Sequence, residues 1–512
     1  MKKIAVALLL FCLSTGAFAN PLVEADTLRI NGHLALWLNT GNDWDQGFYY
    51  GFFVGDRVKS IFDNYVIPNA FGGAVGYSTA RQKFEQHFVV DEKYNQIASG
   101  MIEGMKYAGI DLFSAALNDT LTYKDVLIAN SIPDFTAFSE NWHYNGPGCS
   151  NLTSWGQATV NAPDLLGQTV INRNLDWVNN PYLINNALIV IWVTGNPAKQ
   201  SLVTFGFAGM IGALSGINAS GVATFQNMGN YTAYPTGTGF YPVNLAQRNG
   251  LESADYNADG ICSPRDVTDA VRAHNVAGTF IIHSAGPSGL EIPAEILEIH
   301  NAFGYEIRTR EDNPGFFGDN LVATNHFRKL KPPAYCYRYS RISDSLQTSN
   351  ELDINRNWNV LKAAGVYTNL QTIQFVPNKN MIRFSFAAIG TPAYLIQPGE
   401  VWMDTLFTMF NVGINDKVND GKSSLKVYPN PGKELINIEI ATGKNMIISL
   451  TIRDLKGKEV YSQTKTESDE EVHHFEWNTS GISNGVYFAA FETRSRKGKT
   501  NYQESQKIVV AR

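Results

Sequence analysis

A cysteine that could act as a nucleophile lies in the run Gly148-Cys149-Ser150-Asn151, and Arg173 and Asp176 follow it in the chain. A thiol has an ordinary pKa of about 8.5 and is mostly protonated at neutral pH, so a nucleophilic cysteine needs a base. An α-amine, with a pKa of about 7.7–8.0, could accept that proton, while a carboxylate orients the amine and a guanidinium favours the thiolate. The other interpretation is a small, buried, inert Cys149 and an ordinary surface ion pair.

Two strands joined by a turn would position these residues. The pattern predicts one strand from Cys149 to Val160, a turn at residues 161–164 and a second strand over residues 167–177. An antiparallel hairpin returns its far end to the side of its start. We therefore expect Arg173 and Asp176 to lie beside Cys149.

Polar residues also end two later apolar strands. Asn227 closes a strand that follows a Gly-x-Asn turn at Asn218, and Asn325 and His326 close the strand 321–327. Taken alone, Asn227 is a turn residue. His326 could act as a general base, but a strand-end histidine satisfied by backbone groups explains it better. Further strands are expected at residues 187–194, 201–207, 370–375 and 382–386.

Taken together, the Gly-Cys run, the Arg-x-x-Asp run, the strand ending in Asn, the Asn-His pair and the run 337–341 resemble cysteine N-terminal-nucleophile (Ntn) hydrolases. The similarity is to the acyl-CoA:6-aminopenicillanate acyltransferase type (peptidase C45), with choloylglycine hydrolases and acid ceramidase as distant relatives. It runs discontinuously over roughly residues 30–410. It implies an α+β fold, an αββα sandwich with two stacked sheets between helix layers. The long turn between Cys149 and Arg173 departs from the family pattern.

The resemblance also implies roles for individual residues. The chain would cut itself between Gly148 and Cys149, and the freed α-amine of Cys149 would serve as the base for its own thiol. Arg173 and Asp176 would support this nucleophile. The remaining implied roles are Asn227 as an oxyanion donor, Asn325 beside the reaction centre, Arg338, in preference to Arg341, as the arginine that closes the site, and Asn218 as a structural turn residue.

The activity that the resemblance implies is hydrolysis of the linear C–N bond of an N-acyl amide through a thioester on Cys149. Such an enzyme needs no cofactor for catalysis, and its partner is a small acyl amide whose two parts the sequence does not name. Acyl transfer to an amine is the alternative that differs only in what attacks the thioester. A non-enzymatic cell-surface binding protein with an inert Cys149 is the third interpretation.

An acidic loop of twelve residues lies in an insertion at about residues 252–274. Oxygen ligands would come from positions 1, 3, 5 and 12, a glycine stands at position 6, and position 7 would offer its carbonyl. A helix is predicted after the loop, whereas no entering helix is evident. A structural calcium ion is expected, and a solvated turn is the alternative. The expected ligands are Asp255, Asn257, Asp259, Ile261 and Asp266.

The N-terminal part consists of two predicted segments. Residues 1–19 have the basic start, apolar core and Ala-x-Ala end of a secretory signal peptide. Residues 20–148 are predicted to be mostly helical and would become a separate α chain after self-cleavage. Glycines recur every four residues at 47, 51 and 55 and again at 100 and 104, which would allow close helix packing. We expect a scaffold; the alternative is that Trp37, Trp44 or Phe48 walls an acyl pocket.

Charge and cysteine content restrict the partners. The net charge of −6 opposes nucleic acid as the main partner. Beyond the signal peptide no run of about 18 apolar residues remains, so we expect a soluble mature protein without a membrane span. Three cysteines remain there, Cys149, Cys262 and Cys336, so at least one thiol is free. A Cys262–Cys336 disulfide is conceivable, but unpaired thiols are favoured.

The composition changes after the catalytic segment, which is expected to span residues 149–412. Residues 413–424 are polar and are predicted to be a linker. Residues 425–512 are expected to form a small all-β sandwich, and their Tyr-Pro-Asn-Pro, Gly-Lys-Glu-Val and Gly-Val-Tyr runs, in that order, resemble the sorting domain of Bacteroidetes type IX secretion. This resemblance implies export through the periplasm to the cell surface or the medium, with the secretion machinery as a partner. A β-sandwich binding module is the alternative.

Overall fold

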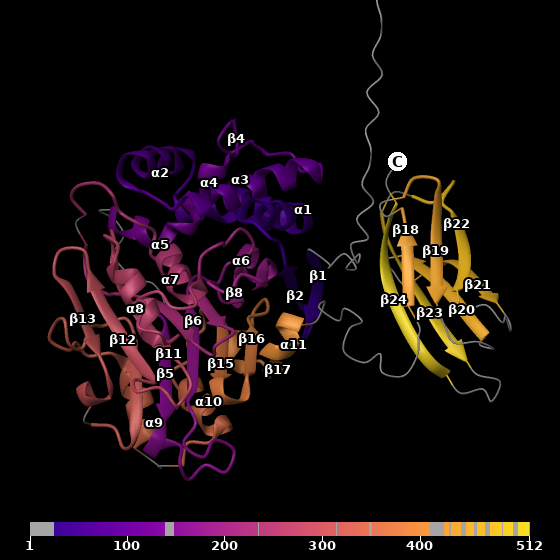
Figure 1. The fold of residues 1–512 in the computed structure, drawn as a ribbon. Helices are drawn as coiled ribbons and strands as arrows, with labels where there is room; N and C mark the ends of the chain where they lie inside the picture. Colours follow the sequence, from indigo (N-terminus) through magenta and orange to yellow (C-terminus); the bar gives the residue numbers. More distant parts are fainter. Residues whose placement is uncertain are drawn as a thin grey trace, which may run out of the picture. The chain divides into compact units, whose positions relative to one another are not determined.

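The computed structural model describes residues 25–138, 148–233, 235–313, 315–347 and 351–408 of the large unit, and most of residues 424–510. Gaps in this last stretch are 430–431, 442–446, 455–457, 466–471, 484 and 495–499. Contacts divide the chain between residues 411 and 412, and the two units are described separately (Figure 1). The expected signal peptide 1–19 and the expected linker, apart from Ser424, lie outside the described residues.

Two sheets form the centre of the large unit. The nine-stranded sheet has the order β1-β2-β7-β8-β9-β10-β11-β12-β13, and the six-stranded sheet has the order β14-β5-β6-β15-β16-β17. Neighbouring strands are antiparallel except β2 and β7. The strands of the first sheet are β1 (Ala25–Ile30), β2 (His33–Leu38), β7 (Ala187–Trp192), β8 (Leu202–Phe207), β9 (Ser215–Asn218), β10 (Ala223–Met228), β11 (Thr279–Ala285), β12 (Ala294–His300) and β13 (Gly304–Arg308). Those of the second are β5 (Ser150–Trp155), β6 (Val170–Asp176), β14 (Asp319–Ala323), β15 (Asn369–Val376), β16 (Met381–Phe386) and β17 (Gly399–Trp402).

An apolar core joins the facing sides of the two sheets. Ile189 and Ile191 of β7 belong to this core together with Ile373 of β15, whereas Leu188 and Val190 belong to a second core on the other face of the nine-stranded sheet. Side chains of a strand alternate between its two faces, so an uninterrupted apolar run such as β7 serves both cores.

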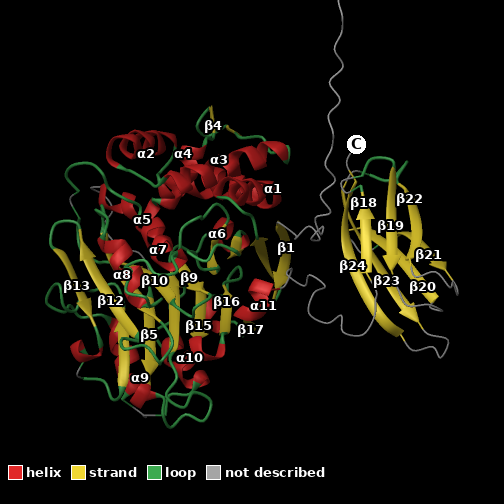
Figure 2. Cartoon of the chain, viewed as in Figure 1, coloured by secondary structure: helices red, strands yellow, loops and turns green. Residues whose placement is uncertain are grey.

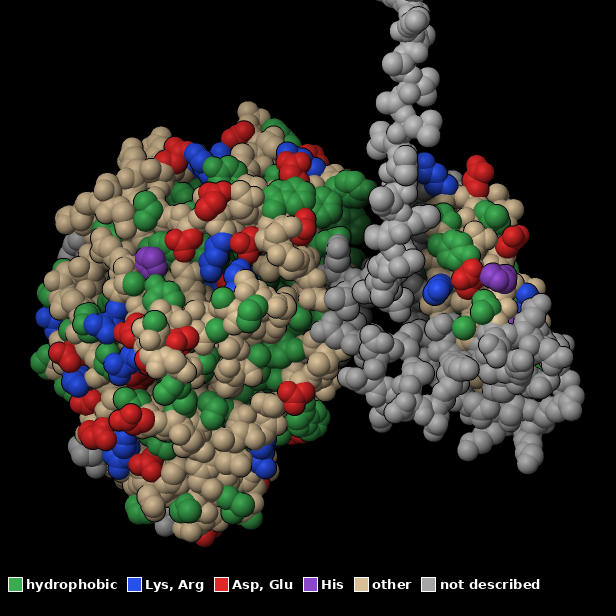
Figure 3. Space-filling model, in the orientation of Figure 1, with side chains coloured by type: hydrophobic (Ala, Val, Ile, Leu, Met, Phe, Trp, Pro, Cys, Tyr) green, Lys and Arg blue, Asp and Glu red, His purple; other side chains and the backbone are tan. Residues whose placement is uncertain are grey.

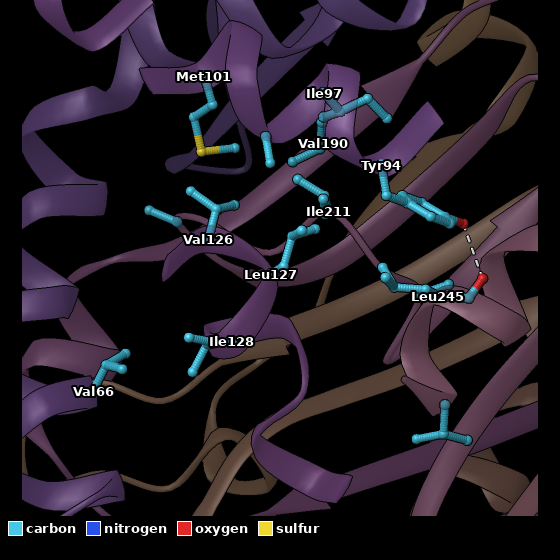
Figure 4. Close-up of a cluster of buried hydrophobic side chains, with 14 of the residues drawn as sticks. Val66, Tyr94, Ile97, Met101, Val126, Leu127, Ile128, Val190, Ile211 and Leu245 are labelled. Carbon is cyan, nitrogen blue, oxygen red and sulfur yellow. Dashed lines mark hydrogen bonds between the residues drawn. The ribbon is translucent and has the colours of Figure 1, made fainter. Parts of the chain in front are cut away.

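Helices pack against both sheets (Figure 2). Figure 4 shows Met101, Leu127 and Val190 in the core between the helices and the nine-stranded sheet. There the Tyr94 hydroxyl donates to the Leu245 carbonyl at 2.9 Å. The helices of this layer are α1 (Asp43–Ile61), the π-helix η1 (Phe62–Ala70), α2 (Ala74–His87), α3 (Glu92–Tyr107), α4 (Tyr123–Asn130), α5 (Ile132–Phe135), α7 (Val243–Glu252) and α8 (Pro264–Arg272). The six-stranded sheet is covered by α9 (Tyr337–Leu346) and α10 (Ile354–Lys362). The described part of the unit also contains α6 (Pro181–Asn185), α11 (Met403–Thr408), the hairpin β3 (Phe113–Ser114)–β4 (Asp119–Thr120) and five short 3₁₀ helices. The expected α+β class is confirmed.

The N-terminal segment differs from the expected helical segment in one respect. Its helices are present, but β1 and β2 precede them, and β2 pairs in parallel with β7 in register Ala35↔Ile189. Residues 33–38 alternate between the two cores, with Leu36 and Leu38 in one and Ala35 in the other. This six-residue alternation is short beside the long helical stretch that follows, and for that reason the prediction missed it.

The expected close packing of glycine strips is confirmed. A Cβ built on Gly51 would lie 1.9 Å from the Met101 carbonyl oxygen, and one on Gly104 would lie 1.9 Å from the Phe48 carbonyl oxygen. The backbones of α1 and α3 therefore approach so closely that only glycine fits at these positions. Each glycine lowers the helix propensity by roughly 1 kcal/mol relative to alanine, and the close contact between the two helices offsets this loss.

The surface of the large unit carries both charges. Figure 3 shows basic and acidic side chains interspersed on its visible face. Trp44 is 37% exposed, and Phe48 stacks between Trp44 and Phe52 with ring centroids 5.3 and 6.4 Å apart. Among the residues that the structure describes, no helix has the length and apolar character that crossing a membrane requires.

The C-terminal unit consists of two small sheets around one core. One has the order β18-β19-β22 and the other β21-β20-β23-β24. Their strands are β18 (Ser424–Tyr428), β19 (Leu435–Ala441), β20 (Ile447–Asp454), β21 (Glu459–Lys465), β22 (Val472–Asn478), β23 (Gly485–Arg494) and β24 (Thr500–Val510). Ile438 and Trp477 from the first sheet and Leu450 and Phe491 from the second are buried in the same cluster. The strands alternate between buried and exposed positions, as expected for a two-layer all-β unit.

We predict that Gly104→Ala destabilises the large unit. The new Cβ would meet the Phe48 carbonyl oxygen at 1.9 Å, so α1 and α3 must separate. Overpacking of this kind costs about 1–3 kcal/mol or more, which exceeds the gain in helix propensity of about 1 kcal/mol. Thermal unfolding of the full chain checks it. Gly41→Ala is the control, because a Cβ there meets nothing within 4 Å; equal melting temperatures for both variants would contradict the packing argument.

Candidate active site

The pairing of β5 with β6 brings the predicted nucleophile and its neighbours together. Asn151 lies opposite Arg173 in this antiparallel pair, Cys149 directly precedes β5, and Asp176 is the last residue of β6. Arg173 Nη2 donates to Cys149 Sγ at 3.6 Å. The expected hairpin is therefore present, and it places Arg173 against the thiol.

The first strand of this hairpin is shorter than predicted. It ends at Trp155 rather than Val160, because Gly156 turns the chain at a φ of +50° into a short 3₁₀ helix, Gly156–Ala158. There is no room for a side chain at this turn, since a Cβ on Gly156 would lie 2.2 Å from Asp319 Oδ2. The connection between β5 and β6 is therefore longer than predicted, and it packs Leu165 and Ala162 into a small core. The pairing of Asn151 with Arg173 is as expected for the hairpin.

Arg173 is a buried cation directed at the thiol. Its side chain is fully buried, and its Nε and Nη1 have no hydrogen-bond partner within the described chain. The guanidinium carbon lies 5.6 Å from the centre of the Phe225 ring, which is an attractive arrangement. Burial lowers the pKa of Arg173 and raises the pKa of the Cys149 thiol, while Arg173 opposes the latter effect. The arginine therefore favours the thiolate in a site that otherwise disfavours charge.

Asp176 is a buried carboxyl with two polar neighbours. Its Oδ1 accepts from Asn369 Nδ2 at 2.9 Å, and its Oδ2 lies 3.6 Å from Arg338 Nη1. Burial raises the pKa of Asp176 to about 7, although Arg338, Asn369 and Arg173 each act to lower it. The carboxyl therefore changes its charge close to neutral pH.

Arg338, rather than the alternative Arg341, reaches this cluster. Its Nη2 donates to Asn325 Oδ1 at 2.7 Å, and its Nη1 donates to the Cys149 carbonyl oxygen and, at 3.1 Å, to Ser150 Oγ. Arg341 is exposed and donates to the Tyr337 hydroxyl instead. Both arginines stand in the first turns of α9, three residues apart, and their side chains have different partners.

Gly148 is enclosed by the same pair of residues. A Cβ on Gly148 would lie 2.0 Å from Arg338 Nη2 and 2.1 Å from Asn325 Oδ1. The backbone on the N-terminal side of Cys149 thus lies directly against two polar side chains, and only a glycine can occupy this position without displacing them.

Asn227 and Asn325 connect the end of β14 to the neighbouring sheet. Asn227 Nδ2 donates to the Thr324 carbonyl oxygen at 3.0 Å, and Asn325 Nδ2 donates to the Met228 carbonyl oxygen at 2.7 Å. Asn151, two residues after the nucleophile, donates to Asn227 Oδ1 at 3.0 Å. Each of the two amide nitrogens carries a second hydrogen, so each can donate one further bond.

An apolar cavity of about 100 Å³ opens at Cys149. This is several times the space that one water molecule needs. Its walls come from α1, η1, α4, α5, α6, α7, β6, β8 and β10 and from loops beside them, and they include Phe62, Tyr65, Leu175 and Met228. The alternative in which Trp37, Trp44 or Phe48 walls the pocket is wrong: Trp37 lies between the two sheets, and neither Trp44 nor Phe48 lines the cavity.

The other singled-out residues have structural surroundings. Asn218 Oδ1 accepts from the Val222 backbone at 2.9 Å and closes the turn between β9 and β10, as expected. His326 Nε2 lies 3.1 Å from Asn230 Nδ2, and Cys149 is not among its partners.

Cys149, Cys262 and Cys336 are all free thiols, so the conceivable disulfide is absent from the described structure. Burial acts to raise the pKa of the Cys336 thiol. A hydrogen bond with His326 and the charge of the nearby Arg338 act in the opposite direction, and the pKa is lowered to about 6.

Sequence reasoning missed three polar residues around the nucleophile, namely Asn151, Asn369 and Gln226. Asn369 holds Asp176, and its only sequence signal is its place at the start of the predicted strand 370–375. Asn151 lies within the run that was singled out, but nothing in that run indicated its bond to Asn227. Gln226 looked like an ordinary strand residue next to Asn227.

The acidic loop is preceded by a helix, contrary to expectation. α7 enters it and α8 leaves it. Asn244, Gln247 and Arg248 are buried in α7, so polar residues occupy part of the helix face that packs inward and conceal the apolar pattern.

Two oxygens of the loop converge. Asp255 Oδ1 and Asn257 Oδ1 both lie 3.1 Å from the Asp259 amide nitrogen, and Asp259 Oδ1 accepts from the Ile261 amide at 2.9 Å. Asp266 forms the capping box of α8, where its Oδ2 accepts from the Ser263 amide at 2.8 Å and its Oδ1 from the Tyr256 amide at 2.7 Å.

Ligand-type oxygens of positions 1 and 3 thus face one point, while the position-12 carboxylate caps a helix. The described residues contain no group of three or more His, Cys, Asp or Glu side chains placed to hold a metal ion. The calcium site with Asp255, Asn257, Asp259, Ile261 and Asp266 stays a prediction.

A calcium titration tests this loop. In the wild-type chain calcium should raise the melting temperature, because a ligand present at 100 times its Kd stabilises the folded state by about 2.7 kcal/mol. The double variant Asp255→Ala, Asp259→Ala should lose that rise, while Asp111→Ala, at an exposed acid elsewhere, should keep it. A wild type that melts at the same temperature with calcium and with chelator would show that the loop is only a turn.

The raised pKa of Asp176 predicts a pH-dependent stability. Between pH 4 and pH 7 the folded chain holds a proton on Asp176 that the unfolded chain has released. Its contribution to stability is therefore complete below pH 4 and is lost as the pH rises through 7. Relative to wild type, Asp176→Asn should gain unfolding free energy between pH 4 and pH 8, by up to about 4 kcal/mol at about 1.4 kcal/mol per unit.

Chemical unfolding at pH 4, 6 and 8 measures this difference. Glu103→Gln, at an exposed carboxyl of α3, is the matched control and should differ from wild type by a nearly constant amount. A constant difference for Asp176→Asn over the same range would mean that the buried carboxyl ionises as it does in water.

Comparison with known proteins identifies the C-terminal unit. Residues 426–511 match the secretion system C-terminal sorting domain. No curated protein matches the sequence. The chain is similar to the solved structure of the Caenorhabditis elegans N-acylethanolamine-hydrolyzing acid amidase ortholog, with 16% identity, 45% of this chain and 93% of that chain covered, and a TM-score of 0.33. It is also similar to a mutant of conjugated bile acid hydrolase from Clostridium perfringens, with 10% identity, 51% and 94% coverage, and a TM-score of 0.32.

Both TM-scores lie below 0.5, so neither structure supports an argument about the chemistry of the site. The match to the sorting domain, in contrast, identifies its part of the chain, because it spans nearly the whole C-terminal unit. The expected sorting domain is confirmed, and its match covers residues 426–511. The chain carries a type IX secretion signal of the Bacteroidetes kind, which directs it to the cell surface or the extracellular space.

Proposed function

We propose that the exported chain is a cysteine Ntn hydrolase that hydrolyses the linear C–N bond of N-acyl amides, with Cys149 as its nucleophile. The observation that carries the proposal is the contact between Arg173 Nη2 and Cys149 Sγ, 3.6 Å long, in the wall of an apolar cavity that Cys149 lines. A structural, inert cysteine has no need of a buried guanidinium whose other nitrogens are unpaired. The peptidase C45-type assignment and the αββα sandwich form part of this proposal.

The first step is self-cleavage between Gly148 and Cys149. The thiol attacks the Gly148 carbonyl carbon, the peptide C–N bond breaks, and the Cys149 nitrogen takes up a proton. Water then hydrolyses the resulting thioester and leaves a free carboxylate on Gly148 and a free α-amine on Cys149. The enclosure of Gly148 by Arg338 and Asn325 supports this step, since it holds the Gly148 Cα beside polar hydrogen-bonding side chains.

Turnover repeats this chemistry on a substrate. The α-amine accepts the thiol proton, the thiolate attacks the substrate carbonyl carbon, and the protonated amine supplies the proton with which the leaving amine departs. Asn227 and Asn325 would donate their remaining amide hydrogens to the oxyanion, a contribution of about 3–4 kcal/mol for one well-placed donor. Asp176, between Asn369 and Arg338, would orient the α-amine. Water finally releases the acyl group as a carboxylic acid.

The proposal divides the chain into an α chain, residues 20–148, and a second chain that begins at Cys149 and contains the catalytic domain, residues 149–412, followed by the linker and the sorting domain. The acyl group of the substrate would occupy the cavity, whose walls come from both chains. These steps need only the chain's own groups and water, and a calcium ion in the loop at 255–266 would have a structural role.

Self-cleavage tests the proposal. The wild-type chain, expressed without residues 1–19, should separate under denaturing conditions into two fragments, the second beginning at Cys149. Cys149→Ala should stay intact and lose activity by a factor on the order of 10⁴ or more. Cys262→Ala removes a thiol away from the cavity and should cleave and turn over like wild type. N-terminal sequencing and hydrolysis of a panel of acyl 4-nitroanilides measure both effects.

A wild-type chain that stays in one piece after prolonged incubation, and that hydrolyses no acyl amide, would overturn the proposal and favour a binding protein. A cleaved chain that transfers acyl groups to added amines faster than to water would keep the nucleophile and change the acceptor.

A further inference from the structure

Two amide side chains interrupt the apolar wall of the cavity. Gln226 of β10 and Asn244 of α7 both line it, and each is only 1% exposed. Their oxygens, Gln226 Oε1 and Asn244 Oδ1, have no hydrogen-bond partner within the described chain. The nitrogens are also weakly bonded: Gln226 Nε2 lies 3.8 Å from Met228 Sδ, and Asn244 Nδ2 lies 3.5 Å from the Asn130 carbonyl oxygen.

The neighbouring Asn130 shows how a buried amide is satisfied in this region. Its Nδ2 donates to the carbonyl oxygens of Val126 and Gly209, both at 2.9 Å, and its Oδ1 accepts from the amides of Ile211 and Gly212 at 2.8 and 3.1 Å. Leaving a buried acceptor unpaired costs about 1–3 kcal/mol. The two cavity amides therefore carry a cost that the adjacent Asn130 avoids.

The two amides belong to one stretch of the wall. The Ala213 amide donates to the Asn244 backbone carbonyl at 2.9 Å, and the Gln226 amide donates to the Leu214 carbonyl at 3.1 Å. The backbones of Asn244 and Gln226 are thus hydrogen-bonded to Ala213 and Leu214, which are consecutive residues of one segment. Asn227, next to Gln226, points to the opposite face of β10 and reaches Asn151, so the polar pair is distinct from the proposed oxyanion donors.

We propose that this pair binds a hydroxyl group on the acyl chain of the substrate. This inference rests on the proposed function, in which the acyl group attached to Cys149 enters the cavity. A hydroxyl can donate to one amide oxygen and accept from an amide nitrogen, so it would satisfy groups that a plain hydrocarbon chain leaves unpaired. The substrate class is therefore a hydroxyacyl amide, and Gln226 and Asn244 determine the specificity.

The test uses acyl 4-nitroanilides of one chain length, unsubstituted or with a single hydroxyl group at successive carbons. With wild type, at least one hydroxyl position should raise kcat/KM about 5- to 150-fold over the unsubstituted chain, the range that corresponds to 1–3 kcal/mol. Gln226→Met and Asn244→Leu should each remove most of this preference and raise kcat/KM for the unsubstituted chain. If the wild type turns over the unsubstituted chain as well as every hydroxylated one, the inference is overturned.

Gln247→Met is the matched control. Gln247 is a fully buried amide whose Oε1 also lacks a partner, but it does not line the cavity, so its replacement should leave the hydroxyl preference unchanged. An equal loss in Gln247→Met would mean that the preference reflects general destabilisation.

A binding measurement separates the failure of this inference from that of the proposed function. Calorimetry with Cys149→Ala compares the free hydroxy acids with the free unsubstituted acid. If a hydroxy acid binds more tightly, and Gln226→Met removes the difference, the hydroxyl subsite stands even when no amide is hydrolysed. Equal binding of all the acids would overturn the subsite while leaving the hydrolase proposal intact.

Discussion

The pairing of β5 with β6 is the constraint on which the site depends. Asn151 faces Arg173 across this pair, and a slip of one residue would turn Arg173 to the other face of the sheet. β14 and β15 hold the two strands on their outer sides, so neither can shift without breaking a second pairing. The thiol is therefore positioned by two strands that are paired on both sides, although the cysteine itself lies just outside the strand.

Charged side chains also lie in the mostly buried surroundings of Cys149. Two guanidinium groups, Arg173 and Arg338, share a nearly dry space with one carboxyl group, Asp176. With the thiol protonated and the carboxyl ionised, the cluster carries one excess positive charge, which loss of the thiol proton would neutralise. Burial raises the pKa of Cys149 despite these cations, so the resting thiol in the intact chain still needs a base. The cluster thus favours the thiolate without generating it.

Much of this arrangement could be predicted from the sequence, because strand alternation and hairpin closure are local rules. The hairpin from Cys149 to Asp176 and the glycine strips of α1 and α3 follow from residue type and spacing, and the turn at Asn218 follows from the family resemblance. The assignment of β2 to the nine-stranded sheet could not be predicted, since its partner β7 lies about 150 residues away and a parallel pairing leaves no local signal.

The polar neighbours were harder to predict for a related reason. Asn369, Gln226 and Asn244 come from three different elements, and each matters only through the side chain or cavity that it meets in the folded chain. In the sequence each is an ordinary amide in a strand or helix. α7 was missed because its inward face is partly polar, so the usual apolar stripe is absent.

The parallel pairing of β2 with β7 has a consequence for the folding of the protein after export. β2 lies on one side of the Gly148–Cys149 bond and β7 on the other, yet they occupy adjacent places in one sheet. If the proposed self-cleavage breaks that bond, global unfolding would release two separate polypeptides. Refolding would then require their encounter and become second order in protein concentration, whereas the uncut chain folds as one molecule. At the high dilution of the extracellular medium a cut molecule that unfolds would be lost, so its lifetime would depend on the rate of unfolding.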